Sequence, residues 1–253
     1  MDRPVELKQH DLFINGKYAR PKSNSYSIDL NPATESPIAQ VAEADNEDVD
    51  IAVGAARAAL KEWSGCKAAQ RGLILQRAAS LLEQHQEELI ELESLDAGKP
   101  LATVRRQDMP AVIDTVRYYA GWCDKITGQV VPTRTDALTY TLREPVGVVG
   151  AIIPWNFPLM IGIWKVAPAL ACGCTLVVKP SELTSLSMLR VAELFTEAGV
   201  PAGAFNVVCG KGSGAGEALV QHPGVDKITF TGSPTVGRHI MKASSASLKK
   251  VTL

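Results

Sequence analysis

The pattern of apolar and polar positions predicts helices in the first half of the chain and alternating strands and helices in the second. Between residues 45 and 125, apolar residues recur every three or four positions with charged residues between them, as in amphipathic helices. Asp45, with Asp48 three residues on, marks the start of the first helix, which runs toward Trp63. A second long helix carries the leucines from 73 to 92, and a third spans about 108–125.

After residue 146, short apolar runs rich in β-branched residues alternate with helical segments. Strands are predicted at 146–153, 174–179, 205–209, 227–231 and 249–253, and the main helices at 158–171, 186–198 and 236–244. Strand, crossover helix and strand make a βαβ unit, which predicts a parallel sheet. Ligands of such sheets bind beyond the carboxyl ends of the strands.

Two further pairs of strand-like runs lie outside this alternation. The first pair, at 26–28 and 38–42, predicts an arm or edge hairpin, and the second, at 128–132 and 138–142, predicts a hairpin closed by a polar turn. The expected fold class is therefore α/β: a Rossmann-like parallel sheet with flanking helices, plus a small antiparallel hairpin.

Composition narrows the function. The chain has 253 residues, 46% of them hydrophobic, with 26 basic against 27 acidic residues, so it offers no charge field for nucleic acid or an anionic membrane. A small polar ligand is the expected partner. The amino-terminal residues are charged, and no apolar run reaches the roughly 18 residues of a membrane span, which predicts a cytoplasmic protein.

The five cysteines follow no disulfide framework and suit a reducing compartment. Cys172 and Cys174 are separated by one residue with no histidine nearby, so they are interpreted as small buried residues, and no metal site is expected.

Two turns should face one crevice, because each follows a predicted parallel strand. Trp155, Asn156 and Phe157 lie between two prolines after the first strand, and residues 179–182 follow the second. Asn156 is either an ordinary turn residue or a fixed amide donor. Glu182 is either a solvated acid or a carboxylate that accepts ribose hydroxyls and repels a 2′-phosphate.

Two other turns are candidates for binding a pyrophosphate. Gly210-x-Gly212-x-x-Ala215 follows a strand and has the form that lets backbone approach phosphate, although glycines also collect in turns for packing. The turn at Gly232 and Ser233 begins a helix, so backbone N–H groups and the helix dipole point toward any anion there. Ser233 is either a further donor or only a helix cap.

Three motifs, at 154–158, 179–182 and 230–237, stand in the order and spacing of one known family. On them, the chain resembles the aldehyde dehydrogenase superfamily from about Phe13 to Leu253, over about the first half of the family's usual length. The resemblance implies three parts: 1–127, an arm and helices of the cofactor-binding domain; 128–145, a bridging hairpin that joins subunits; and 146–253, the α/β NAD-binding portion. The catalytic domain is expected to be absent.

The resemblance also implies roles for individual residues. Asn156 would stabilise the oxyanion formed when a thiolate attacks an aldehyde, and Lys165 matches a lysine near the catalytic centre, although a helix lysine with a packed stem is an equal alternative. Phe157 would help to shape the pocket. The NAD-binding residues would be Ile153, Pro154, Trp155, Lys179, Ser181, Glu182, Gly212, Phe230, Thr231, Gly232, Ser233 and Val236.

The family's reaction also needs a cysteine nucleophile and a glutamate base, which in the resembled enzymes come after the segment that matches 251–253. We therefore expect the NAD-binding portion of an NAD-dependent aldehyde dehydrogenase, inactive alone, whose full-length form acts on an aldehyde as a homo-oligomer. One alternative is a non-catalytic NAD-binding or subunit-pairing module. Another is a different enzyme that uses Cys209, which lies at a strand end beside the glycine turn.

Overall fold

The fold is a layered α/β structure around one central sheet, seen in a computed structural model that describes residues 7–253. Seven strands run in the order β12-β11-β8-β9-β10-β2-β3, in which β2 is Leu12–Ile14 and β3 is Lys17–Ala19. The parallel strands are β8 (Val148–Ile152), β9 (Thr175–Lys179), β10 (Phe205–Val207), β11 (Lys227–Phe230) and β12 (Lys250–Thr252). All five predicted strands of the second half are confirmed.

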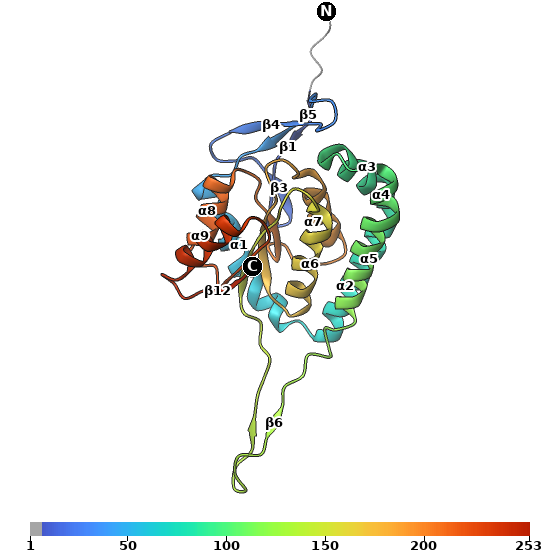
Figure 1. The fold of residues 1–253 in the computed structure, drawn as a ribbon. Helices are drawn as coiled ribbons and strands as arrows, with labels where there is room; N and C mark the ends of the chain where they lie inside the picture. The colour runs from blue at the N-terminus through green and yellow to red at the C-terminus, as the bar shows by residue number, and fades with distance from the viewer. Residues whose placement is uncertain (1–6) are drawn as a thin grey trace, which may run out of the picture.

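Helices cover both faces of this sheet. α6 (Pro158–Ala171) and α7 (Leu186–Glu197) lie on one face, beneath an outer layer of α2 (Ala68–Gln84), α3 (Gln86–Ala97) and α5 (Met109–Ala120) (Figure 1). α1 (Asn46–Gly65), α8 (Glu217–Gln221) and α9 (Pro234–Ser244) lie on the other. The α6 bounds match the prediction, since Pro158 starts the helix and Gly173 takes a positive φ of 82° after it.

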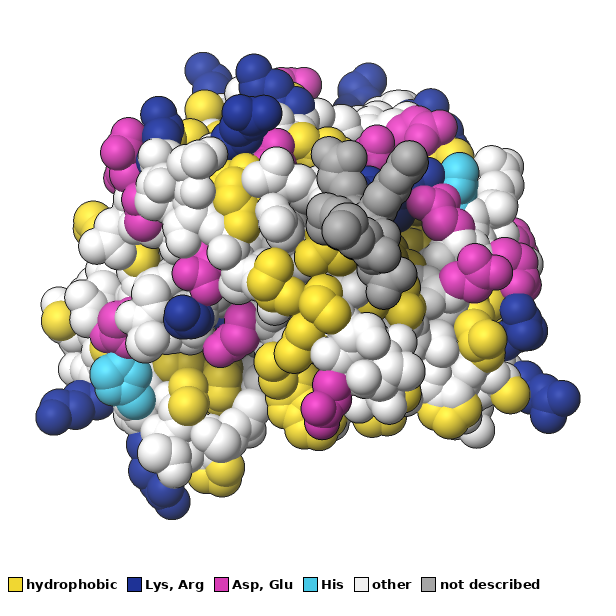
Figure 2. All heavy atoms as spheres, turned by 90° about the horizontal axis from the view of Figure 1, so that it is seen from above, with side chains coloured by type: hydrophobic (Ala, Val, Ile, Leu, Met, Phe, Trp, Pro, Cys, Tyr) yellow, Lys and Arg dark blue, Asp and Glu magenta, His cyan; other side chains and the backbone are white. Residues whose placement is uncertain are grey.

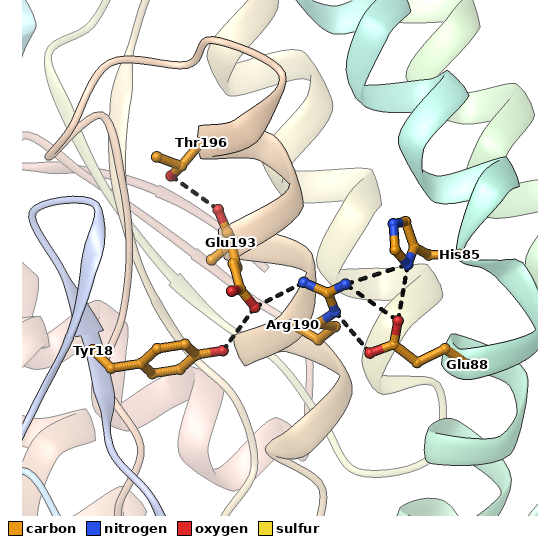
Figure 3. Close-up of polar contacts among 7 residues, drawn as sticks. Tyr18, His85, Glu88, Arg190, Glu193 and Thr196 are labelled. Carbon is orange, nitrogen blue, oxygen red and sulfur yellow. Dashed lines mark hydrogen bonds and ion pairs between the residues drawn. The ribbon is translucent and has the colours of Figure 1, made fainter.

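The single long helix predicted over the leucines from 73 to 92 is wrong, because the chain breaks at His85 into α2 and α3. There the backbone leaves helical geometry, and the His85 ring joins a polar network (Figure 3). The Arg190 guanidinium of α7 contacts His85 at 3.2 Å, Glu88 of α3 at 2.7 Å and Glu193 at 2.8 Å. Tyr18 donates to Glu193, so the network ties α3, α7 and the amino-terminal strands together.

Two other boundaries also differ from the prediction. The third helix is preceded by a short α4 (Leu101–Thr103), for which Pro100 is the N-cap, and by a π-helical turn, η1 (Val104–Asp108). The glycine turn before α8 is itself helical from its third residue, as the π-turn η2 (Gly212–Gly216).

The amino-terminal segment adds strands that periodicity did not reveal. β2 (Leu12–Ile14) pairs antiparallel with β10, and β3 (Lys17–Ala19) pairs with β2. The Asn15 amide donates to Asn206 of β10 at 2.9 Å. The predicted edge hairpin is confirmed as β4 (Tyr26–Leu30) and β5 (Pro37–Ala42), which form a separate sheet with β1 (Gln9–His10).

The second predicted hairpin is present but short. β6 (Val130–Val131) pairs with β7 (Thr139–Tyr140), and the arm that carries them projects away from the central sheet and its helices (Figure 1). Its apolar side chains are exposed: 70% for Val130, 75% for Leu138 and 69% for Leu142. The arm therefore carries apolar side chains that nothing in the described chain covers.

The surface carries no dominant charge on the face that Figure 2 shows, where basic and acidic side chains are interspersed around exposed hydrophobic ones. Over residues 7–253, no helix is long and apolar enough to cross a membrane. Within the same residues, no group of three or more His, Cys, Asp or Glu side chains is placed to hold a metal ion.

Candidate functional site

Three neighbouring strands end at one level, which brings the predicted turns together. Ile152, at the end of β8, is in register with Lys179 of β9 and with Phe230 of β11. β9 and then β10 are added next to one edge of β8, and the chain then crosses back so that β11 pairs with the opposite edge of β8. This reversal is a topological switch point, where open α/β sheets bind ligands beyond their carboxyl ends.

The turn after β8 presents Asn156 to solvent. Ile153 is 3% exposed and anchors the start of the turn, whereas Trp155 is 59% exposed. The Asn156 side chain is exposed and makes no hydrogen bond within the described residues. Its amide is therefore available to donate to a ligand.

The turn after β9 holds an ion pair. The ammonium of Lys179, a residue only 2% exposed, lies 3.3 Å from the Glu182 carboxylate, whose side chain is 43% exposed. Burial lowers the pKa of Lys179, and Glu182 opposes that effect. Burial also pushes the pKa of Glu182 upward, but the backbone N–H groups of Glu182 and Gly212, together with Lys179, hold it below its usual range. The Glu182 carboxylate is therefore ionised at neutral pH.

The glycine turn reaches the same place, since the Gly212 backbone is close enough to Glu182 to help lower the pKa of its carboxyl group. A Cβ built on Gly212 or Gly214 would have no neighbour within 4 Å, so packing does not require glycine at either position. Gly210 is different, because its φ of 134° favours glycine. The open backbone at 212 and 214 favours the phosphate interpretation of this turn. Ser181, which is 9% exposed, accepts from the Leu183 N–H within its own turn.

The turn after β11 is compact and ends in a helix cap. The Ser233 Oγ accepts from the Val236 N–H at 3.3 Å, so the cap interpretation of Ser233 is confirmed, while its hydroxyl hydrogen remains free to donate. A Cβ on Gly232 would lie 2.4 Å from the Phe230 ring, which requires glycine there. α9 therefore begins close to the carboxyl end of β11, the strand next to β8 at the switch point.

Lys165 lies on the α6 face of the sheet, about two helical turns from the start of α6. Its ammonium donates to Thr231 at 2.8 Å and to Thr229 at 3.2 Å. Burial, aided by Lys227, lowers the pKa of Lys165 to about 8. It faces a cavity of about 370 Å³ that Lys227 also lines. The structure thus places Lys165 beneath the Thr231 turn.

Cys209 does not have the surroundings of a nucleophile. It is 0% exposed, and burial raises the pKa of its thiol to about 12. Because the thiolate is the reactive form, the hypothesis of an enzyme built on Cys209 is wrong.

Two side chains that contact the residues beside the Asn156 turn, Glu93 and Lys99, were not among the residues predicted from the sequence. Glu93 of α3 is fully buried and accepts from the first turns of both α6 and α7. The Lys99 ammonium lies 3.6 Å from the centroid of the Phe157 ring. Glu93 could have been found from the sequence, because it is an acidic residue four positions after Leu89 on the apolar stripe of a predicted helix.

Known proteins match this chain along most of its length. The profile of the aldehyde dehydrogenase family matches residues 18–253. The chain is 49% identical to DhaS of Bacillus subtilis over 244 residues, which are 96% of this chain and 49% of that protein. It is 46% identical to human retinal dehydrogenase 2 over 253 residues, 98% of this chain and 49% of that protein.

A solved structure matches equally well. The NAD+ complex of an aldehyde dehydrogenase from Bacillus cereus superposes with a TM-score of 0.95 at 48% identity, over 97% of this chain and 50% of that one. The chain thus spans about half the length of the relatives it matches. Since the family profile covers far more than half of the residues, the chain belongs to the aldehyde dehydrogenase family.

Proposed function

We propose that this chain binds NAD at the switch point beside β8. Glu182 and Lys179 hold the adenosine ribose, and the Thr231–Ser233 turn with the first turn of α9 receives the pyrophosphate. The level ends of β8, β9 and β11 carry this proposal, because they bring an acid, an anion-binding turn and an exposed amide to one edge. The Bacillus cereus relative, which has the same fold over this region, was solved with NAD+.

The residues present fit the cofactor. An ionised carboxylate suits two ribose hydroxyls and disfavours a 2′-phosphate, so NAD is preferred over NADP. The open backbone at Gly212 and Gly214 leaves room for a ligand beside that carboxylate. The remaining proposed contacts are Ile153, Pro154, Trp155, Ser181, Gly212, Phe230, Gly232 and Val236.

The reaction we propose for the complete protein is oxidation of an aldehyde to a carboxylic acid. Bound NAD would accept the hydride. The Asn156 amide would stabilise the oxyanion, a contribution of about 3 kcal/mol for one such donor. Lys165, with its depressed pKa, would lie near the reacting groups as a proton carrier or positive charge. The nucleophile and the base are proposed to lie in the half of the relatives' length that this chain does not span.

The projecting hairpin supports a proposal for the partner. Its exposed apolar side chains and unpaired strand edges suit association with another subunit, so the complete protein is proposed to be a homo-oligomer. A small-molecule aldehyde is the other proposed partner.

Calorimetric titration of the purified chain with NAD tests the cofactor proposal. We expect one site per chain and a weaker or undetectable NADP signal. An aldehyde added to the NAD-loaded chain should give no steady NADH production. Absence of NAD binding by a folded chain would overturn the proposal, and steady turnover would overturn the assignment of the nucleophile to residues outside it.

A further inference from the structure

One helix supplies polar contacts to the starts of both helices that follow the proposed cofactor turns. α6 begins directly after the Asn156 turn, and α7 begins shortly after the turn at Glu182. α3 lies against both helices (Figure 1). The shared carboxylate comes from Glu93, near the carboxyl end of α3.

The two oxygens of Glu93 each take one contact. One accepts from the Leu159 N–H at 3.2 Å, and the other accepts from the Ser187 hydroxyl at 2.7 Å. Pro158 has no N–H, so Leu159 supplies the first free donor of α6. Glu93 therefore caps α6 from a distance while holding the first turn of α7.

A second contact fixes the Asn156 turn from the same side. The Lys99 ammonium, six residues after Glu93, lies 3.6 Å from the centroid of the Phe157 ring and pairs with Asp108. The side chains of Lys99 and Asp108 are 14% and 3% exposed. Phe157 immediately follows Asn156, so Lys99 and Glu93 hold the end of this turn on both sides of Pro158.

We propose that Glu93 is a positioning residue that sets the separation between the Asn156 turn and the Lys179–Glu182 turn. This inference rests on the proposed function, in which the second turn holds the adenosine ribose and the first supplies the cofactor contacts of Pro154 and Trp155. A ligand that touches only the ribose turn does not depend on that separation. A dinucleotide that spans both turns does.

The test compares NAD with AMP on the purified chain by calorimetry. Glu93→Leu removes both acceptors at similar size, and we expect NAD to bind about tenfold more weakly while AMP affinity stays within about twofold. Glu93→Gln keeps an acceptor for Leu159 and a partner for Ser187, so it should bind both ligands like the wild type. Glu91→Leu, an exposed position on the same helix, is the matched control and should change neither affinity.

A second measurement does not depend on NAD. The Leu159 amide should be protected from hydrogen exchange in the wild type and in Glu93→Gln, and should lose protection in Glu93→Leu. Should Glu93→Leu not fold, Glu93→Asp, whose carboxylate is too short to reach both contacts, should give the same selective loss of NAD affinity.

The outcomes separate the two proposals. A wild-type chain that shows a protected Leu159 amide but binds neither ligand overturns the proposed function. Wild-type NAD binding with an equal loss of NAD and AMP affinity in Glu93→Leu overturns the positioning role and leaves the function standing. Unchanged NAD affinity in a folded Glu93→Leu variant also overturns the positioning role of Glu93.

Discussion

At the scale of single residues, the candidate site pairs a buried ammonium with a partly exposed carboxylate. Lys179 is almost fully buried, and its ammonium is kept beside Glu182, whose carboxylate stays ionised through Lys179 and backbone donors. Under the proposed function that charge would face the adenosine ribose, where it would favour NAD over NADP.

Replacing Glu182 with Gln should therefore change cofactor preference. The amide keeps one acceptor for a ribose hydroxyl but no longer repels a 2′-phosphate, so we expect the ratio of NAD to NADP affinity to fall by about tenfold or more. Titrations with both cofactors measure the ratio, and Glu197→Gln on the far end of α7 serves as the control. A ratio equal to that of the wild type would contradict this role for Glu182.

Glu93 should also make stability depend on pH. Burial raises the pKa of Glu93 from an ordinary 4.5 to about 7 in the folded chain. The unfolded chain therefore loses this proton first as pH rises, so the contribution of Glu93 to stability is most favourable below about pH 4.5 and falls as pH rises toward 7. The loss amounts to roughly 3 kcal/mol at most.

Denaturant unfolding at about pH 5 and about pH 8 checks this, because Glu93→Gln cannot titrate. The stability of the wild type relative to Glu93→Gln should be lower at the higher pH. A stability difference between the two proteins that is the same at both pH values would show that Glu93 does not titrate in this range.

At the scale of elements, local sequence signals predicted most helix and strand boundaries correctly, and the others differ where residues distant in sequence make contact. Asp45 and Asp48 form the capping box at the start of α1 that their spacing suggested. The break between α2 and α3 had no comparable local signal. It coincides with contacts to Arg190, which is 105 residues away from His85 in the chain.

The α1 cap gives a prediction for stability. Asp45→Ala removes the acceptor for the Glu47 and Asp48 N–H groups, so unfolding free energy should fall by about 1 kcal/mol. Chemical denaturation measures the change, and Glu62→Ala at an exposed position of the same helix should stay within about 0.5 kcal/mol of the wild type. A loss of the same size in both variants would contradict the capping role of Asp45.

At the scale of the whole molecule, the exposed apolar side chains of the hairpin arm lead us to propose that the arm takes part in self-association. The double variant Val130→Lys, Leu142→Lys would place charge on two exposed apolar positions of the arm, so it should self-associate less than the wild type. Sedimentation velocity over a range of concentrations checks this. NAD titration of the same variant is the control, and its affinity should be unchanged. Equal self-association of both proteins would mean that another surface joins the subunits.

The sequence alone determined the local parts of this protein. The βαβ alternation, the Pro158 helix start and the three punctuated turns follow from periodicity and from the φ restrictions of proline and glycine, which act between near neighbours. The sequence motifs also pointed to the family, which the profile match over residues 18–253 bears out.

Only the tertiary structure decided which distant groups meet. The level ends of β8, β9 and β11 come from strand register. Glu93 contacts two helices at residues that lie 66 and 94 positions further along the chain. Cys209 could be rejected only once its burial was known. Such contacts depend on how the sheet and the helices pack. Hydrophobic periodicity and turn chemistry act between near neighbours and do not specify which residues distant in sequence come into contact.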